Sequence, residues 1–223
     1  MKRNVDINEI SDGKLYTAND LVKADCNDCK GCSDCCKGMG ESIILDPYDI
    51  YRLTSGLNVS FEWLLGGKIE LDMYDGMILP HLSMNGRDES CAFLNGEGRC
   101  SIHSIRPGIC RLFPLGRIYD EEGFHYFLQV HECSNKNRTK VKVKKWIDTP
   151  DLKQYEEYIL KWHDFTNEMQ SLVTRDLDEV MIKKINMFAL QQFYIERYNN
   201  EDFYKQFEER LAKTRTVIKT LLK

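Results

Sequence analysis

Five of the nine cysteines of this 223-residue chain lie within eleven residues, in the segment CNDCKGCSDCC. The spacing is C-x2-C-x2-C-x2-C-C, over Cys26, Cys29, Cys32, Cys35 and Cys36. Thiols this dense do not suit a disulfide framework, whereas two residues between cysteines let one turn of chain bring two sulfurs to one metal ion. The segment therefore predicts a thiolate metal site around which the fold has to be built.

The remaining four cysteines all precede residue 134, and the last 90 residues contain none. A cysteine far along the chain can complete a site that a local cluster begins, and so tie distant segments to one metal. The distant cysteines are Cys91, Cys100, Cys110 and Cys133. We expect three parts: a polar lead-in over 1–25, a cysteine-cluster metal-binding domain over 26–146, and a helical region over 147–223 that packs on it.

Several turn and capping residues predict short elements in the first 145 residues. Asp46-Pro47 is typical of a helix start, with Asp as N-cap and Pro in the first turn. Asp75-Gly76 and Asn95-Gly96 predict hairpin turns, the second of which would place Cys91 and Cys100 on neighbouring strands. Residues 117–130 alternate as a strand, a turn and a second strand.

Apolar residues recur at three- and four-residue spacing from Tyr155 to Met169, again from Leu177 to Ile195, and again from Phe203 to Leu222. This period predicts amphipathic helices whose apolar faces form core rather than a cofactor pocket. The expected fold class is α+β: an irregular cysteine-rich module of short strands and helices, followed by about three C-terminal helices.

The amino-acid composition limits the classes of partner that the protein is expected to bind. The formal net charge is −4 with 30% charged residues, which is ordinary for a protein in water and excludes nucleic-acid binding driven by bulk charge. No apolar run has the roughly 18 residues of a membrane span, and the first residues lack the apolar core of a signal peptide. We expect a cytoplasmic protein with reduced thiols, no membrane and no nucleic acid as partners. The basic segment 136–146 fits an edge strand protected by lysines.

The residues alone do not decide which metal is bound or how many ions there are. Eight cysteines could fill two tetrahedral sites, or one four-cysteine iron–sulfur site with four thiols left over. The bacterial ferredoxin run also begins C-x2-C-x2-C, but its next cysteine follows three residues later and precedes proline, unlike Cys35 here. In an extended chain the adjacent Cys35 and Cys36 would point to opposite faces, so one of them could serve a different metal. We predict Cys29, Cys32, Cys35 and Cys110 as ligands.

Four pieces of the chain resemble a known family: CKGCSDCC (29–36), CAFLNGEGRCSIH (91–103), IRPGICRLFP (105–114) and the isolated Cys133. Together they resemble the CxxCxxCC cysteine-cluster family of the YkgJ type, described as zinc- or iron-chelating. The resemblance covers roughly residues 26–134 and does not include the C-terminal helices. Cys26 lies outside the family pattern.

The resemblance implies eight metal ligands, and this chain has a cysteine at each position: Cys29, Cys32, Cys35, Cys36, Cys91, Cys100, Cys110 and Cys133. The family includes flagellin lysine N-methylases, for which an iron–sulfur cluster is implicated together with S-adenosylmethionine. Those enzymes are longer chains, and only the cysteine module is shared. A lysine methylase activity is therefore one implication of the resemblance.

Arg106 and Arg111 flank Cys110 and are candidate cofactor-binding residues. They could hydrogen-bond to cluster sulfurs or a carboxylate, or simply to backbone carbonyls. The family often has tyrosine where this chain has His103, which weakens His103 as a ligand despite its C-x2-H spacing from Cys100. His131 lies two residues before Cys133. The roles of Cys26, His103 and His131 stay undecided from sequence.

The first functional hypothesis is a protein that holds an iron–sulfur cluster, as 4Fe-4S, or iron through thiolates, in support of redox or protein-modification chemistry. The second is a zinc-binding structural or interaction module without catalysis, which would act on a protein partner. The third is a protein-lysine N-methylase-like enzyme. Neither catalytic residues nor the substrate follow from the sequence.

Overall fold

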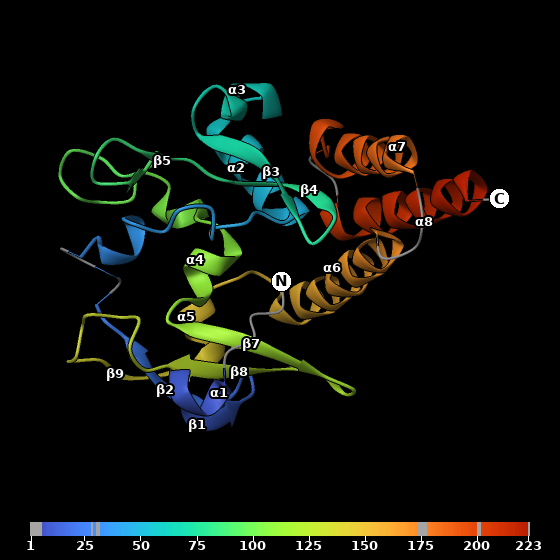
Figure 1. Ribbon diagram of the computed structural model, residues 1–223. Helices are drawn as coiled ribbons and strands as arrows, with labels where there is room; N and C mark the ends of the chain where they lie inside the picture. The colour runs from blue at the N-terminus through green and yellow to red at the C-terminus, as the bar shows by residue number, and fades with distance from the viewer. Residues whose placement is uncertain (1–5, 28, 30–31, 174–177, 200–201, 223) are drawn as a thin grey trace. The chain divides into compact units, whose positions relative to one another are not determined.

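The computed structural model of the chain describes residues 6–27, 29, 32–173, 178–199 and 202–222 (Figure 1). The chain forms two compact units. We name Met1–Ile43 with Met84–Leu160 the cysteine unit, and Ile44–Ser83 with Lys161–Lys223 the helical unit. Residues 44–83 thus group with the C-terminal residues. The three expected domain ranges stay a prediction.

A three-stranded antiparallel sheet of order β1-β8-β7 lies in the cysteine unit (Figure 1). Its strands are β1 (Ser11–Tyr16), β7 (Leu115–Asp120) and β8 (Gly123–Gln129), and the short helix α1 (Ile7–Ile10) leads into β1. The β7–β8 hairpin closes at the pair Asp120 and Gly123, and Gly123 has a φ of 132°, which a side chain would disfavour. The strand–turn–strand expected over 117–130 is confirmed.

A second, two-stranded sheet pairs β2 (Leu21–Asp25) with β9 (Thr139–Lys142), and helix α5 (Val143–Ile147) follows β9 directly. The inward side chains of these elements form a core with the β7–β8 hairpin, in which Val22, Ala24 and Trp146 are buried. Burial of each large apolar side chain stabilises by about 1.5–3 kcal/mol. The Trp146 indole also donates from Nε1 to the carbonyl oxygen of Phe113 at 3.1 Å. This core lies directly beside the cysteines.

Shorter elements complete the cysteine unit. They are the 3-10 turn η1 (Asp34–Cys36), the paired strands β5 (Met84–Asn85) and β6 (Ser90–Cys91), the 3-10 turn η2 (His103–Ile105) and helix α4 (Gly108–Leu112). This part of the unit thus consists of short elements joined by loops, as expected for an irregular cysteine-rich module.

Capping residues set the first elements of the helical unit. Helix α2 (Pro47–Leu57) begins at a capping box in which Asp46 and Asp49 each accept from the other's backbone N–H, as the Asp46-Pro47 signature predicts. Helix α3 (Phe61–Leu65) follows, capped by the Ser60 hydroxyl. Strands β3 (Ile69–Tyr74) and β4 (Met77–Leu82) then form the hairpin expected at Asp75-Gly76.

Long C-terminal helices bury aromatic side chains. Helix α6 (Leu152–Val173) spans the boundary between the units, and the helical unit also holds α7 (Glu179–Leu190), a π-helical turn (Gln191–Ile195) and α8 (Phe203–Leu221) (Figure 1). Within the helical unit the rings of Trp162, Phe165 and Phe193 pack with centroids 5.2–5.7 Å apart. The apolar stripe on α6 is therefore core, as predicted.

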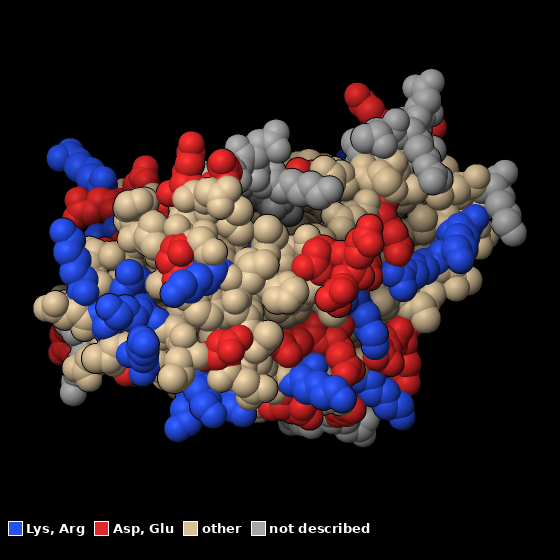
Figure 2. Space-filling model, turned by 90° about the horizontal axis from the view of Figure 1, so that it is seen from below, with Lys and Arg blue, Asp and Glu red and all other residues tan. Residues whose placement is uncertain are grey.

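The α+β class and the helical C-terminal region are confirmed. Among the described residues, none of the helices has both the length and the apolar character needed to cross a membrane. On the face shown in Figure 2, Lys and Arg side chains are interspersed with Asp and Glu. The lysine-bearing strand β9 pairs with β2 alone in its two-stranded sheet, so it is an edge strand as the basic segment predicted.

Candidate metal centre

The cysteine-rich segment turns tightly immediately after β2. Asn27 and Cys29 both have a positive φ, of 56° and 54°, so the chain reverses within a few residues. The carboxylate of Asp25 accepts from the Asn27 N–H at 3.0 Å and from the Thr139 hydroxyl of β9 at 3.2 Å. The Cys32 N–H then donates to the Cys29 carbonyl at 3.1 Å. These turns hold successive cysteines on one short stretch of chain.

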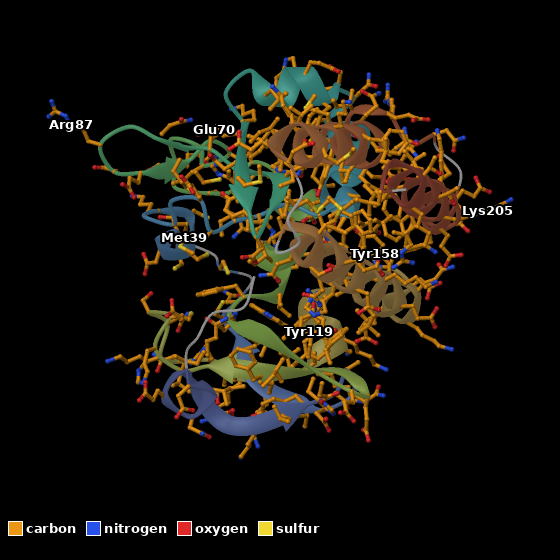
Figure 3. All side chains as sticks on the ribbon, turned by 45° about the vertical axis from the view of Figure 1, so that its right-hand side comes forward. Met39, Glu70, Arg87, Tyr119, Tyr158 and Lys205 are labelled. Atoms are coloured by element: carbon orange, nitrogen blue, oxygen red, sulfur yellow. The ribbon has the colours of Figure 1, made fainter. Side chains whose placement is uncertain are left out.

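Cys35 and Cys36 lie in the 3-10 turn η1, closed by a bond from the Cys36 N–H to the Ser33 carbonyl at 2.9 Å. The expectation that they point to opposite faces assumed an extended chain, and the structure has a helical turn there instead. The two thiols are close enough to hydrogen-bond to each other. Met39, labelled in Figure 3, lies in the loop that follows.

Backbone pairing brings Cys91 close to this segment. Lys37 forms an isolated bridge with Ser90, and the Gly38 N–H donates to the Glu89 carbonyl at 3.0 Å. Cys91 is the next residue after Ser90, in β6, and is buried. The loop after Cys36 and the strand carrying Cys91 are therefore neighbours, although more than fifty residues separate them.

The hairpin expected over 91–103 is only partly correct. The turn at Asn95 is present, where its side chain accepts from the Arg99 N–H at 2.8 Å. Yet Cys100 bridges Leu94 rather than Cys91, and Cys91 pairs with Met84 in the β5–β6 ladder. The reason is a tight turn that closes with the Leu94 N–H on the Cys91 carbonyl at 2.8 Å and takes Cys91 out of the hairpin.

Five sulfur-bearing residues from two distant segments line one pocket of the cysteine unit. Cys26, Cys29, Cys32 and Cys35 come from the N-terminal cluster, and Cys133 comes from the residues after β8. Phe113, Pro114 and Trp146 supply apolar wall. Cys110 lies in helix α4, bracketed by Pro107 and Pro114 as expected, and is not among the pocket-lining residues.

Inside the pocket the sulfur atoms of Cys26 and Cys29 are 3.6 Å apart. Two thiolates bound to one zinc at about 2.3 Å with tetrahedral angles stand about 3.8 Å apart, so this pair fits a shared ion. Over the described residues, which omit 28, 30 and 31, no three His, Cys, Asp or Glu side chains form a ready-made metal site. The other sulfurs would therefore have to move closer when a metal binds. All nine cysteines carry thiols rather than disulfides.

Burial and crowding disfavour thiolates in this centre. Burial and the nearby Cys26 sulfur raise the pKa of Cys29 to about 12. A hydrogen bond with Cys36, together with burial, raises the pKa of Cys35 far above its ordinary value. Burial likewise raises the pKa of Cys100 and of Cys133. A bound cation would reverse this balance, because it stabilises the charged sulfur directly.

Arg106 is a positive charge that acts on three of these sulfurs, while Arg99 also acts on Cys100 and Arg138 acts on Cys133. The Arg106 guanidinium lowers the pKa of Cys29, Cys35 and Cys100, opposing the effect of burial at each. One guanidinium nitrogen also contacts the His103 ring. A cation in this position suits an anionic thiolate centre, and the role of Arg106 toward a cofactor stays a prediction.

Arg111 has different surroundings. Its side chain is 4% exposed and donates to the backbone carbonyls of Arg106 at 3.1 Å and Ser104 at 2.6 Å, and to that of Asp148. These bonds tie helix α4, which carries Cys110, to the η2 turn and to the end of α5. They give Arg111 a structural role, and a role toward a bound cofactor stays a prediction.

Sequence reasoning passed over two acidic residues that line the pocket, Asp34 and Glu132. Asp34 lines the pocket, and its carboxylate accepts a hydrogen bond from the Ser134 hydroxyl, next to Cys133. This bond joins the two chain segments that supply the pocket sulfurs. No spacing rule marks Asp34, whereas the C-x2-C spacing of Cys26 and Cys29 did mark Cys26. His131 is exposed.

Comparison with known protein families agrees with this geometry. The chain matches the model of the CxxCxxCC family, "Putative zinc- or iron-chelating domain", over residues 28–139. No curated protein and no solved structure matches it. The family match covers half of the chain, including the cluster from Cys29 onward and Cys133, and leaves Cys26 outside. The chain therefore belongs to the CxxCxxCC family of zinc- or iron-chelating domains.

Proposed function

We propose that the protein binds zinc or iron through cysteine thiolates of the pocket beside the β2–β9 sheet. The observation that carries this proposal is the convergence of five cysteines from two distant segments on that pocket. Free thiols in a core would be scattered among apolar side chains, whereas a metal site needs several donors facing one space. The family match supports metal chelation independently.

The pocket suits a soft, positively charged ion. Thiolates favour zinc, iron and iron–sulfur clusters over hard cations such as magnesium. A bound ion would supply Lewis-acid chemistry if zinc, or electron transfer if iron. The residues of this chain would hold it, with Phe113 and Trp146 limiting the access of water and Arg106 balancing the negative charge of the sulfurs.

Two occupants are supported by different observations. The 3.6 Å between the sulfurs of Cys26 and Cys29 favours one ion shared by two cysteines, as in a mononuclear zinc or iron site. An iron–sulfur cluster is supported by the apolar wall and by Arg106, since buried clusters are stabilised by nearby positive charge and hydrogen bonds to sulfur. The 4Fe-4S type, ligation by all eight family cysteines, and a lysine methylase activity stay predictions from the sequence.

Elemental analysis and a visible spectrum test the proposal directly. Full-length protein is purified without oxygen from cells supplied with both metals. Iron with acid-labile sulfide and broad visible absorption would identify a cluster, and zinc without colour would identify a zinc module. Protein that carries neither metal, and takes up neither on reconstitution, would refute the proposal.

Substitutions locate the site. Cys32→Ser and Cys35→Ser each remove a pocket sulfur, and we expect each to lower the bound metal sharply. Ser33→Ala is the matched control, because it alters one of the two residues between them without removing a sulfur. Equal metal content in all three variants would show that the pocket is not the binding site.

Partners and location follow the same proposal. Pocket thiols can bind metal only while they are reduced, which fits the expected cytoplasmic location. A zinc module without chemistry of its own would act through a protein partner. Pull-down of the metal-loaded and chelator-treated chain would show whether any partner depends on the metal.

A further inference from the structure

Cys26 occupies an unexpected position for a residue outside the family match. It directly follows strand β2, is only 9% exposed, and packs in the same core as Val22, Ala24 and Trp146. A small buried thiol there could be core alone, as free cysteine often is. Its sulfur, however, also lines the pocket with the family cysteines, and this gives it a second environment.

The geometry between Cys26 and Cys29 is that of two donors to one ion. Their sulfurs are 3.6 Å apart, close to the separation of about 3.8 Å that two thiolates adopt on a tetrahedral zinc. Asn27 and Cys29, which lie between β2 and the rest of the cluster, both have a left-handed backbone conformation, which non-glycine residues adopt infrequently.

Two further sulfurs face the same pair. Cys32 and Cys133 line the pocket with Cys26 and Cys29. The sulfur of Cys133 lies close enough to Cys26 and Cys32 for both to raise its pKa. Cys35 lines the pocket too and raises the pKa of Cys29, but its thiol also hydrogen-bonds to Cys36 and it raises the pKa of Cys100, so we assign it to a separate group of cysteines.

We propose that Cys26 is a metal ligand that shares one ion with Cys29, and that Cys32 and Cys133 complete this four-thiolate site. The inference rests on the proposed metal binding and adds Cys26, which lies outside the family pattern, to seven of the eight family cysteines; Cys110 is assigned to neither group. Cys35, Cys36, Cys91 and Cys100 then form the second group of donors. The bridge between Lys37 and Ser90 brings Cys36 and Cys91 together, and the nearby Cys35 raises the pKa of Cys100.

Zinc titration of the reduced full-length chain tests the assignment. Cys26→Ser should lose one zinc per chain or bind it roughly 100-fold or more weakly, because it removes a direct ligand. Val22→Ala is the matched control, since it trims another buried residue of β2 in the same core without removing sulfur. It should bind as much zinc as the wild type. Cys26→Ala is a second variant if a buried serine hydroxyl prevents folding.

Double variants show which sulfurs share an ion. Cys26→Ser combined with Cys29→Ser should lose no more zinc than either change alone, because both remove the same site. Cys26→Ser combined with Cys100→Ser should lose the zinc of both groups. Additive loss in the first pair would overturn the shared site.

The outcomes separate this inference from the proposed function. Wild-type protein that binds neither zinc nor iron would refute the function itself. Wild-type protein that binds zinc while Cys26→Ser binds it equally well would overturn only the role of Cys26. A disulfide between Cys26 and Cys29 in the zinc-loaded wild type, seen as the loss of two hydrogens in the peptide mass, would also overturn it.

Discussion

Replacing Arg111 by lysine should destabilise the cysteine unit strongly. Arg111 donates to the backbone carbonyls of Ser104, Arg106 and Asp148, and its side chain is 4% exposed. A planar guanidinium can serve three carbonyls in different directions, whereas a lysine ammonium is a single point that reaches one or two of them. The substitution therefore keeps the charge and removes most of the bonds.

The expected magnitude follows from those bonds. A hydrogen bond from a charged donor contributes about 1.5–3 kcal/mol, so the loss of two lowers the free energy of unfolding by about 3–6 kcal/mol. Domains are typically stable by about 5–15 kcal/mol, so this loss is a large share of the total. The effect should be present with and without metal, because backbone carbonyls rather than metal are the partners of Arg111.

Urea denaturation of zinc-loaded and chelator-treated protein measures the loss of stability with and without metal. Arg87→Lys is the matched control, because Arg87 is an exposed arginine of the same unit (Figure 3) and should change stability by less than about 0.5 kcal/mol. A loss below about 1 kcal/mol for Arg111→Lys would refute the structural role. A loss confined to the zinc-loaded protein would instead support the sequence-based prediction that Arg111 faces a bound group.

Three further predictions concern other parts of the chain. Asn186→Ala should lower the free energy of unfolding of the helical unit by about 1–3 kcal/mol, because it leaves the Ile78 N–H and the Gly76 carbonyl without this partner. The control is Met187→Ala, which changes an exposed residue of the same helix. Equal melting curves for the two variants would contradict the prediction. Asp46→Ala should cost about 1 kcal/mol by removing the N-cap of α2, and a thermal melt that matches the wild type would count against it. Zinc affinity should keep rising with pH beyond about 8.5, where an ordinary thiol titrates, because Cys29 has a pKa of about 12 and releases its proton only when metal binds. A zinc affinity that levels off near pH 8.5 in competition titrations would contradict the expected rise.

Much of the local structure could be predicted from short-range chemistry. The capping box at Asp46, the hairpin turn at Asp75-Gly76 and the buried stripe of α6 all depend on residues within a few positions of one another. The expected hairpin over 91–103 was only partly correct, because the pairing of Cys91 depends on residues outside that segment. Its turn residues were identified correctly, but the longer pairing depended on strand β5, which those residues do not specify.

Cysteine identity and spacing by themselves indicated metal chelation, which the family match supports, and predicted that a C-x2-C cluster begins the site and that distant cysteines complete it. Spacing constrains only neighbours in sequence, because one turn of chain can bring just two or three sulfurs together. Tertiary packing decided that Cys133 joins Cys26, Cys29, Cys32 and Cys35 at one pocket, and that residues 44–83 group with the C-terminal helices. The first of these depends on the core formed by β2, β8 and α5, whose contacts link residues more than a hundred positions apart. The second depends on contacts within the helical unit, such as the hydrogen bonds from the Tyr194 hydroxyl to the Leu45 carbonyl and from the Ile78 N–H to the Asn186 side chain.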